Sequence, residues 1–220
     1  MTGLRIAVAG ATGLVGRCLV QQLCAEPSVG TVHALARRPL DWAHPKLVMH
    51  VVNFAALPAL PPLDAVYLAL GTTIKIAGSQ AAFRAVDFDA NLAVARAAQA
   101  AGARRAGLVS AMGANAKSSV FYSRIKGELE DALAALGFDA LVIARPSMLR
   151  GDRAALGQPV RAGELRWARL DALLRPLIPA NLRAIDAADV AAALRRQLPT
   201  AQGRAVLPSG AMQGANTSGA

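Results

Sequence analysis

Short apolar runs recur along this chain, and longer segments with helical periodicity separate most of them. The runs, which predict strands, lie at 4–10, 31–37, 46–52, 64–70, 106–112 and 139–146. The segments that predict helices lie at 14–25, 80–101 and 122–136. Continuously apolar strands are typical of a parallel sheet that helices cover on both faces. The pattern therefore predicts an α/β protein with a doubly wound parallel sheet and a small C-terminal elaboration on the substrate side.

The length of the chain, 220 residues, is most economically used by one domain. We place this domain at residues 1–200, with a helix predicted over 185–198. Residues 147–182 are expected to form a small lid on the substrate side. Residues 208–220 are small, polar and rich in glycine, which predicts a flexible tail. Between the second and fourth predicted strands, prolines and the lack of a helical pattern predict short or irregular connections.

The composition is 54% hydrophobic and 4% aromatic, and no apolar run reaches the ~18 residues of a membrane span. The start of the chain lacks the pattern of a cleavable signal. Cys18 and Cys24 fall on different faces of one predicted helix and fit no metal-binding motif. We therefore expect a cytoplasmic protein without a membrane partner or a bound metal.

The formal net charge of +10 raises the question of a nucleic-acid partner. The basic residues are scattered, however, and no aromatic side chains alternate with them as a stacking platform requires. We expect a diffuse basic surface, a small-molecule substrate and no nucleic acid, in a monomer or a homodimer. Such a surface also attracts anionic ligands, among them a phosphorylated cofactor.

Three glycines stand three residues apart in "AVAGATGLVG", between the first predicted strand and the first predicted helix. In a doubly wound sheet this turn leads to a helix N-terminus, whose free N–H groups favour a pyrophosphate. The first glycine permits the tight turn, the second the approach of the phosphates, and the third close packing. A turn that uses glycine for packing alone is the alternative. We assign the dinucleotide contacts of this turn to Gly10, Thr12, Gly13, Leu14, Val15 and Gly16.

The end of the second predicted strand distinguishes the two nicotinamide dinucleotides. An NAD site usually has an acidic residue about 20 residues beyond the glycines, bound to the ribose 2′-hydroxyl. Here the stretch is "LARRPL", with Arg37 and Arg38 and no acid before Asp41. Two guanidinium groups can bind a 2′-phosphate with charge-assisted hydrogen bonds, which favours NADP(H) over NAD(H). A pair of solvated loop arginines is the alternative.

A second group of candidate residues occurs in "LVSAMGANAKSSVFYSRIKGELEDAL". Ser110 ends the fifth predicted strand, and Tyr122 and Lys126 are four residues apart on the next predicted helix, so these two share a face. Reduction of a carbonyl by hydride needs a proton for the new alkoxide, and a phenol with a pKa of about 10 needs a nearby ammonium to supply it at neutral pH. Ser110 can polarise the carbonyl. An ordinary amphipathic helix is the alternative.

With these residues the chain resembles the atypical short-chain dehydrogenase/reductases, and most closely the branch of small proteins that includes the Tat-interacting oxidoreductase-like proteins. The resemblance covers most of the chain, in "GATGLVG", "LGTTIKIAG", "SSVFYSRIKGELE", "ALVIARPSMLRGDR" and "IDAADVAAAL". It implies a Rossmann fold, NADP binding and a Ser-Tyr-Lys site at Ser110, Tyr122 and Lys126, the latter two also touching the cofactor. It further implies cofactor contacts at Leu70, Gly71, Thr72 and Pro146.

Two positions depart from the family's pattern. Many relatives have an asparagine that supports the lysine through water, and here Asp87 stands at that place, with Asn91 one turn later. Asn53 stands where many relatives have the aspartate that meets adenine, and the resemblance implies that its amide contacts this ring.

Two classes of function fit these residues. The first is an NADP-dependent oxidoreductase that transfers hydride to or from a small carbonyl or alcohol. The second is a non-catalytic NADPH-binding protein that acts as a redox sensor, regulator or scaffold. The Ser-Tyr-Lys set favours the enzyme, because a sensor has little use for a proton donor beside the nicotinamide.

Overall fold

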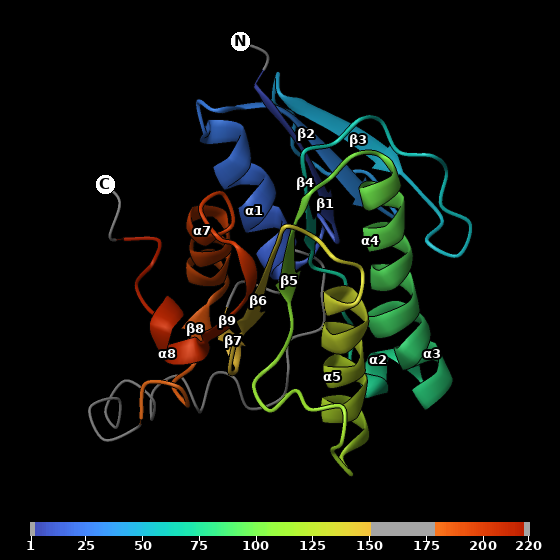
Figure 1. Cartoon of the computed structure of the whole chain (residues 1–220), viewed down its shortest axis with the longest axis vertical. Helices are drawn as coiled ribbons and strands as arrows, with labels where there is room; N and C mark the ends of the chain where they lie inside the picture. Colours follow the sequence, from blue (N-terminus) through green and yellow to red (C-terminus); the bar gives the residue numbers. More distant parts are fainter. Residues whose placement is uncertain (1–2, 151–178, 218–220) are drawn as a thin grey trace.

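A computed structural model describes residues 3–150 and 179–217 of the protein. In this part of the chain one sheet has seven strands, in the order β3-β2-β1-β4-β5-β6-β9, and all neighbours pair in parallel (Figure 1). The strands are β1 (Leu4–Ala9), β2 (Val29–Ala36), β3 (Leu47–Val51), β4 (Ala65–Leu68), β5 (Arg105–Val109), β6 (Ala140–Arg145) and β9 (Gly203–Pro208). The predicted doubly wound parallel sheet is confirmed.

Helices cover both faces of the sheet. On one face lie α1 (Leu14–Ala25) and α7 (Ala187–Gln197), and on the other lie α4 (Asn91–Ala100) and α5 (Phe121–Ala134) (Figure 1). Each face has its own apolar core, because the strands are buried on both sides. The side chains that the helices contribute include Leu19, Leu23, Val190 and Leu194 on the first face, and Val94, Leu129 and Leu133 on the second.

The strand order reverses direction between β1 and β4. Ala9, at the end of β1, is level with Leu35 of β2 and Leu68 of β4, so the carboxyl ends of these strands meet at one edge. In open α/β sheets, ligands bind at this edge, where the chain leaves the sheet in opposite directions. The topology therefore brings the glycine turn after β1 and the turn after β4 to a common place.

The expected helix over 80–101 is divided into three consecutive segments: α3 (Gln80–Arg84), a π-helix η1 (Ala85–Ala90) and α4. A π-helix closes i→i+5 hydrogen bonds and shifts the phase of the side chains around the axis. This segment buries Asp87 completely. A short helix, α2 (Ile74–Ala77), precedes it and ends at Gly78, whose φ is +83°.

The C-terminal part differs from the sequence prediction of a domain that ends at 200 with a tail from 208. Residues 203–208 form β9, which pairs with β6 along its whole length. The following helix α8 (Ser209–Met212) buries the Met212 side chain. The carboxylate of Asp189 on α7 then accepts backbone N–H groups from Gly214 and Asn216 at 3.0 and 2.9 Å. The domain thus extends to residue 217 at least.

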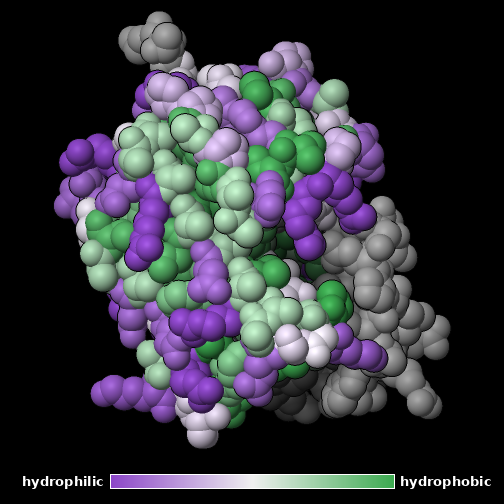
Figure 2. All heavy atoms as spheres, turned by 90° about the vertical axis from the view of Figure 1, so that its right-hand side faces the viewer, coloured by the Kyte–Doolittle hydropathy of each residue, from purple (hydrophilic) through white to green (hydrophobic). Residues whose placement is uncertain are grey.

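The predicted lid over 147–182 falls mostly on residues 151–178, which lie outside the described residues. β7 (Leu149–Arg150), near the start of this range, pairs in parallel with β8 (Ile185–Asp186), which lies just beyond its end. None of the helices in 3–150 and 179–217 is long and apolar enough to cross a membrane. Figure 2 shows hydrophilic and small apolar side chains mixed over one face of the molecule.

Candidate functional site

The turn after β1 depends on two glycines for its shape. Gly10 has a φ of +82°, and a Cβ added there would lie 2.5 Å from the carbonyl oxygen of Ala69. A Cβ added at Gly16, in the first turn of α1, would overlap the carbonyl group of Gly10. The turn and the helix can therefore approach each other this closely only when both positions lack a side chain.

The first turn of α1 has the groups that a pyrophosphate needs. Gly13, the N-cap residue, has no side chain to cap this helix end, and the first turn of α1 contains no acidic residue. The free N–H groups of such a turn, together with the helix dipole, favour an anion. A Cβ added at Gly13 would lie 3.2 Å from the carbonyl oxygen of Gly10, so a side chain at this position would crowd the turn. Of the predicted contacts, Thr12, Leu14 and Val15 belong to the same turn.

The loops after β2 and β3 carry the predicted contacts to the adenosine end. Arg37 and Arg38 are exposed directly after Ala36, the last residue of β2. Asn53 is exposed after β3, and its Oδ1 accepts a hydrogen bond from the Ala55 N–H at 3.0 Å. The predicted contact of Asn53 with adenine would therefore use its side-chain NH₂ group, and it stays a prediction.

The turn after β4 is joined to η1 and α5 by a buried carboxylate. Asp87 Oδ2 accepts a hydrogen bond from the Thr72 N–H at 2.8 Å, and Asp87 Oδ1 lies 2.8 Å from Lys126 Nζ. The side chains of Lys126 and Asp87 are 5% and 0% exposed. Gly71 lies beside the pair, since a Cβ added there would be 3.9 Å from Lys126 Nζ. Asp87 thus holds the Lys126 ammonium at the carboxyl edge of β4.

Asn91 has a different role from the asparagine of the family's pattern. Its Nδ2 donates to the carbonyl oxygens of Leu70 and Asp87, at 3.1 and 3.0 Å. The residue therefore ties the start of α4 to the turn after β4. Direct support of the lysine comes from Asp87, through an ion pair.

Tyr122 lies one turn before Lys126 on α5 and is 36% exposed. Its ring packs against that of Phe83 on α3, with centroids 5.6 Å apart. Phe83 is fully buried and also contacts Phe121, so it fixes the start of α5. The Tyr122 ring is thus held at the surface, one helical turn from the buried Lys126. No other tyrosine of the described chain lies on α5, and Tyr67 is buried within β4.

Ser110, the third predicted catalytic residue, is buried after β5 and has a carboxylate partner. Its hydroxyl donates a hydrogen bond to Glu130 Oε1 at 2.6 Å. Glu130 also accepts from Arg145 Nη2 at 2.6 Å and from Arg204 Nη2 at 3.1 Å. The Ser110 hydroxyl therefore already donates its hydrogen bond within a buried ionic cluster. It could donate to a substrate carbonyl only after its hydrogen bond to Glu130 is broken. The hydrogen bond to the Glu130 carboxylate raises the pKa of the Arg145 guanidinium above its usual value, so Arg145 stays charged beside Glu130.

Glu130 is a functional candidate that the sequence reasoning missed. Tyr122, Lys126 and Glu130 follow one another at four-residue intervals, so all three share one face of α5. The sequence did offer a signal for Glu130: it places an acid and a base on a helix whose residues Leu129 and Leu133 pack into the core. The last predicted contact, Pro146, is buried after β6 and accepts a hydrogen bond from the Met112 N–H at 2.9 Å.

Comparison with known proteins places this geometry in a family. Residues 10–199 match the family described as NAD(P)H-binding. The chain is 36% identical over 197 residues to protein FMP52, mitochondrial, of Candida albicans, which covers 83% of this chain and 82% of that protein. It is 32% identical over 206 residues to protein fmp52, mitochondrial, of Aspergillus fumigatus, covering 82% and 88% of the two chains.

Solved structures share the fold at low sequence identity. MoeE5 in complex with UDP-glucose and NAD superposes with a TM-score of 0.70 at 19% identity, over 92% of this chain and 75% of that one. An oxidoreductase of the short-chain dehydrogenase/reductase family from Burkholderia thailandensis superposes with a TM-score of 0.67 at 20% identity, over 96% and 94%.

The comparisons also correct one expectation. The sequence predicts a cytoplasmic protein, whereas the curated relatives are named mitochondrial proteins, so the cytoplasmic prediction is wrong. The error arose because the prediction rested on the lack of a recognisable signal and on cysteine usage, and neither feature identifies a compartment. The family match over most of the chain, the relatives and the parallel sheet agree with the predicted resemblance. This chain belongs to the NAD(P)H-binding family and has the doubly wound Rossmann fold that these solved structures share.

Proposed function

We propose that this protein is an NADP(H)-dependent oxidoreductase that transfers hydride to or from a small carbonyl or alcohol. One observation carries the proposal: Asp87 fixes the buried Lys126 ammonium at 2.8 Å, one helical turn from the exposed Tyr122. A lysine is costly to bury, and the chain uses a dedicated buried acid to keep it at the carboxyl edge of the sheet.

The residues of the chain fit a dinucleotide along this edge. The first turn of α1 would hold the pyrophosphate, and Arg37 and Arg38 would hold the 2′-phosphate of the adenosine ribose. Gly71 and Thr72, which lie beside the ion pair, would also contact the cofactor. When bound, the nicotinamide supplies or accepts the hydride.

Tyr122 is the proton donor in the direction of reduction. Its hydroxyl gives a proton to the oxygen of the substrate, and the positive charge of Lys126 stabilises the phenolate that remains. The ammonium has three N–H donors, so it can retain Asp87 while it orients the tyrosine or the nicotinamide ribose. Asp87 is a positioning residue, since it acts through Lys126.

The engagement of the Ser110 hydroxyl by Glu130 favours a second candidate, a non-catalytic NADP(H)-binding protein that senses the redox state. In that case the carbonyl-polarising donor is never released, and binding of the cofactor is the function. The two candidates predict different results in one experiment.

The experiment measures loss of NADPH absorbance with a panel of small aldehydes, ketones and quinones. For an active substrate, Tyr122→Phe should lower kcat by about 10²–10⁴-fold, the span of general acid–base catalysis, and leave NADPH affinity within about twofold. Tyr67→Phe is the matched control, because Tyr67 is buried in the core on the α1 and α7 face of the sheet, whereas Tyr122 and Lys126 lie on α5, which covers the other face. Full activity of Tyr122→Phe removes this residue from the mechanism, and NADPH binding without turnover of any substrate supports the sensor.

The choice of cofactor is tested by titration of the unmodified protein. NADPH should bind more tightly than NADH, and alanine at both Arg37 and Arg38 should remove most of that preference. A hydrogen bond to a charged group contributes ~1.5–3 kcal/mol, or about ten- to hundredfold in affinity. Equal affinity for NADPH and NADH in the unmodified protein refutes the assignment.

A further inference from the structure

An ion pair connects the phosphate-binding turn with the loop that follows β2. Arg17 comes directly after Gly16, and its Nη1 lies 2.7 Å from Asp41 Oδ1. Asp41 is three residues beyond Arg38 in the chain. The side chains of Arg17 and Asp41 are 27% and 70% exposed, so the contact lies where a ligand can reach it.

The loop that carries Asp41 is held against α1 by its apolar neighbours. Leu40 and Trp42 both pack against the core on the α1 face, in which Leu14 and Cys18 of α1 also take part. These contacts bring the loop to the start of α1 without fixing the exposed carboxylate itself.

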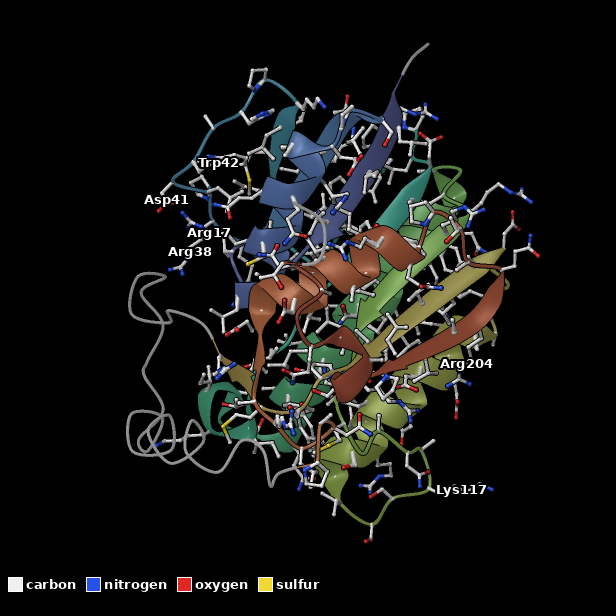
Figure 3. The ribbon with its side chains drawn as sticks, turned by 90° about the vertical axis from the view of Figure 1, so that its left-hand side faces the viewer. Arg17, Arg38, Asp41, Trp42, Lys117 and Arg204 are labelled. Carbon is white, nitrogen blue, oxygen red and sulfur yellow. The ribbon has the colours of Figure 1, made fainter. Side chains whose placement is uncertain are left out.

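Three charged side chains therefore gather at one corner of the molecule. Figure 3 shows Arg17, Arg38 and Asp41 there, with Trp42 beside them. Arg17 and Arg38 are positive, and the one negative group, the Asp41 carboxylate, is paired with Arg17. In Rossmann folds this region, between the first turn of α1 and the end of β2, receives the adenosine ribose.

We propose that Arg17 is a ligand of the cofactor's 2′-phosphate and that Asp41 is an internal competitor for the same guanidinium. The inference rests on the NADP(H) function proposed above. A phosphate monoester has a charge of about −1.5 to −2 and three acceptor oxygens, so it outcompetes one carboxylate. Displacement of Asp41 is easy, because an exposed ion pair contributes little to stability.

The position of Asp41 argues against a role as the ribose ligand of an NAD site. Such an acid usually comes about 20 residues beyond the glycines, at the end of the second strand. Here the residue that follows β2 is Arg37, which is basic. The Asp41 carboxylate comes four residues later and is paired with Arg17. NADH lacks the 2′-phosphate and leaves this ion pair unchanged. Arg17 therefore raises the preference for NADPH, and Asp41 reduces it.

The test is calorimetric titration of the full chain with NADPH and NADH, and with 2′,5′-ADP and 5′-AMP as probes of the phosphate alone. Arg17→Ala should weaken NADPH and 2′,5′-ADP by at least about tenfold and change NADH and 5′-AMP less than about twofold. Asp41→Asn should tighten both phosphorylated ligands by about two- to fivefold. Arg104→Ala and Asp139→Asn are matched controls, because they break an exposed pair at the amino ends of β5 and β6.

The outcomes separate this inference from the proposed function. If the unmodified protein binds NADPH and NADH equally, the NADP(H) assignment fails and the inference fails with it. If it prefers NADPH and Arg17→Ala keeps that preference, only the inference is overturned. The Asp41→Asn variant tests the inference independently of Arg17→Ala. If Asp41→Asn binds NADH and 5′-AMP more weakly than the unmodified protein, Asp41 is a ribose ligand and the inference is overturned.

Discussion

Removal of the charge of Asp87 should destabilise the fold strongly. Asp87→Asn keeps the shape of the side chain and one oxygen for the Thr72 N–H, and leaves the Lys126 ammonium without its counter-ion. Because the Lys126 side chain is 5% exposed, water cannot replace the lost carboxylate. Breaking a buried pair by removal of one partner costs about 3–5 kcal/mol. In a protein of this size that lowers Tm by roughly 6–20 °C.

A double-mutant cycle isolates the pair. Lys126→Met leaves the Asp87 carboxylate unpaired and should cost a similar ~3–5 kcal/mol, whereas Asp87→Asn with Lys126→Met leaves no buried charge at this position. We expect the double variant to be no less stable than either single one, which is a coupling energy of about 3 kcal/mol. Urea unfolding followed by circular dichroism measures all four free energies of unfolding.

The control is Asp139→Asn, which breaks the pair of Arg104 and Asp139, whose side chains are 74% and 50% exposed. An exposed pair contributes about 0–1 kcal/mol. The reasoning is refuted if Asp87→Asn costs no more than this control, or if the effects of Asp87→Asn and Lys126→Met simply add.

Two further predictions concern the turn after β1 and His33 on β2. Gly16→Ala should lower the free energy of unfolding by roughly 3 kcal/mol or more, because the added Cβ overlaps the Gly10 carbonyl. Gly13→Ala should stay folded and should lose NADPH affinity in a titration. The reverse order of stabilities would contradict this assignment. Burial, the neighbouring His50 and Arg5 lower the pKa of His33. The unfolded state therefore takes up the proton first as pH falls, so the urea midpoint should drop as the pH falls below about 6.5, the ordinary pKa of histidine, and His33→Gln should flatten the drop. An unchanged pH dependence in His33→Gln would exclude His33 as its source.

The sequence predicts much of this fold because its signals are local. Six apolar runs coincide with β1 to β6, and the glycine spacing coincides with the turn into α1. The spacing of Tyr122 and Lys126 is also a local property, since four residues make about one helical turn. The sequence predicts short or irregular connections between the second and fourth strands. In the described chain, loops without a helix connect β2 to β3 and β3 to β4.

The features that the sequence does not reveal depend on contacts between distant segments. The strand β9 begins with Gly203, ends with Pro208 and is half exposed, and only pairing with β6 makes it a strand. The π-helix leaves no mark in the helical periodicity of residues 80–101. Asp87 and Lys126 are 39 positions apart, and Glu130 and Arg204 are 74 apart. These pairings are decided by the sheet order, which local patterns do not encode.

The place of β9 at the border of the sheet governs how the chain tolerates shortening. A chain truncated after residue 200 would lack β9 and would leave the largely apolar β6 with an unpaired row of backbone donors and acceptors. Such an unprotected strand invites pairing with other molecules and the growth of insoluble assemblies. The same cut would take Arg204 from the buried Glu130. We therefore expect the solubility of this protein to depend on residues 203–217, which lie far in sequence from the glycine turn after β1.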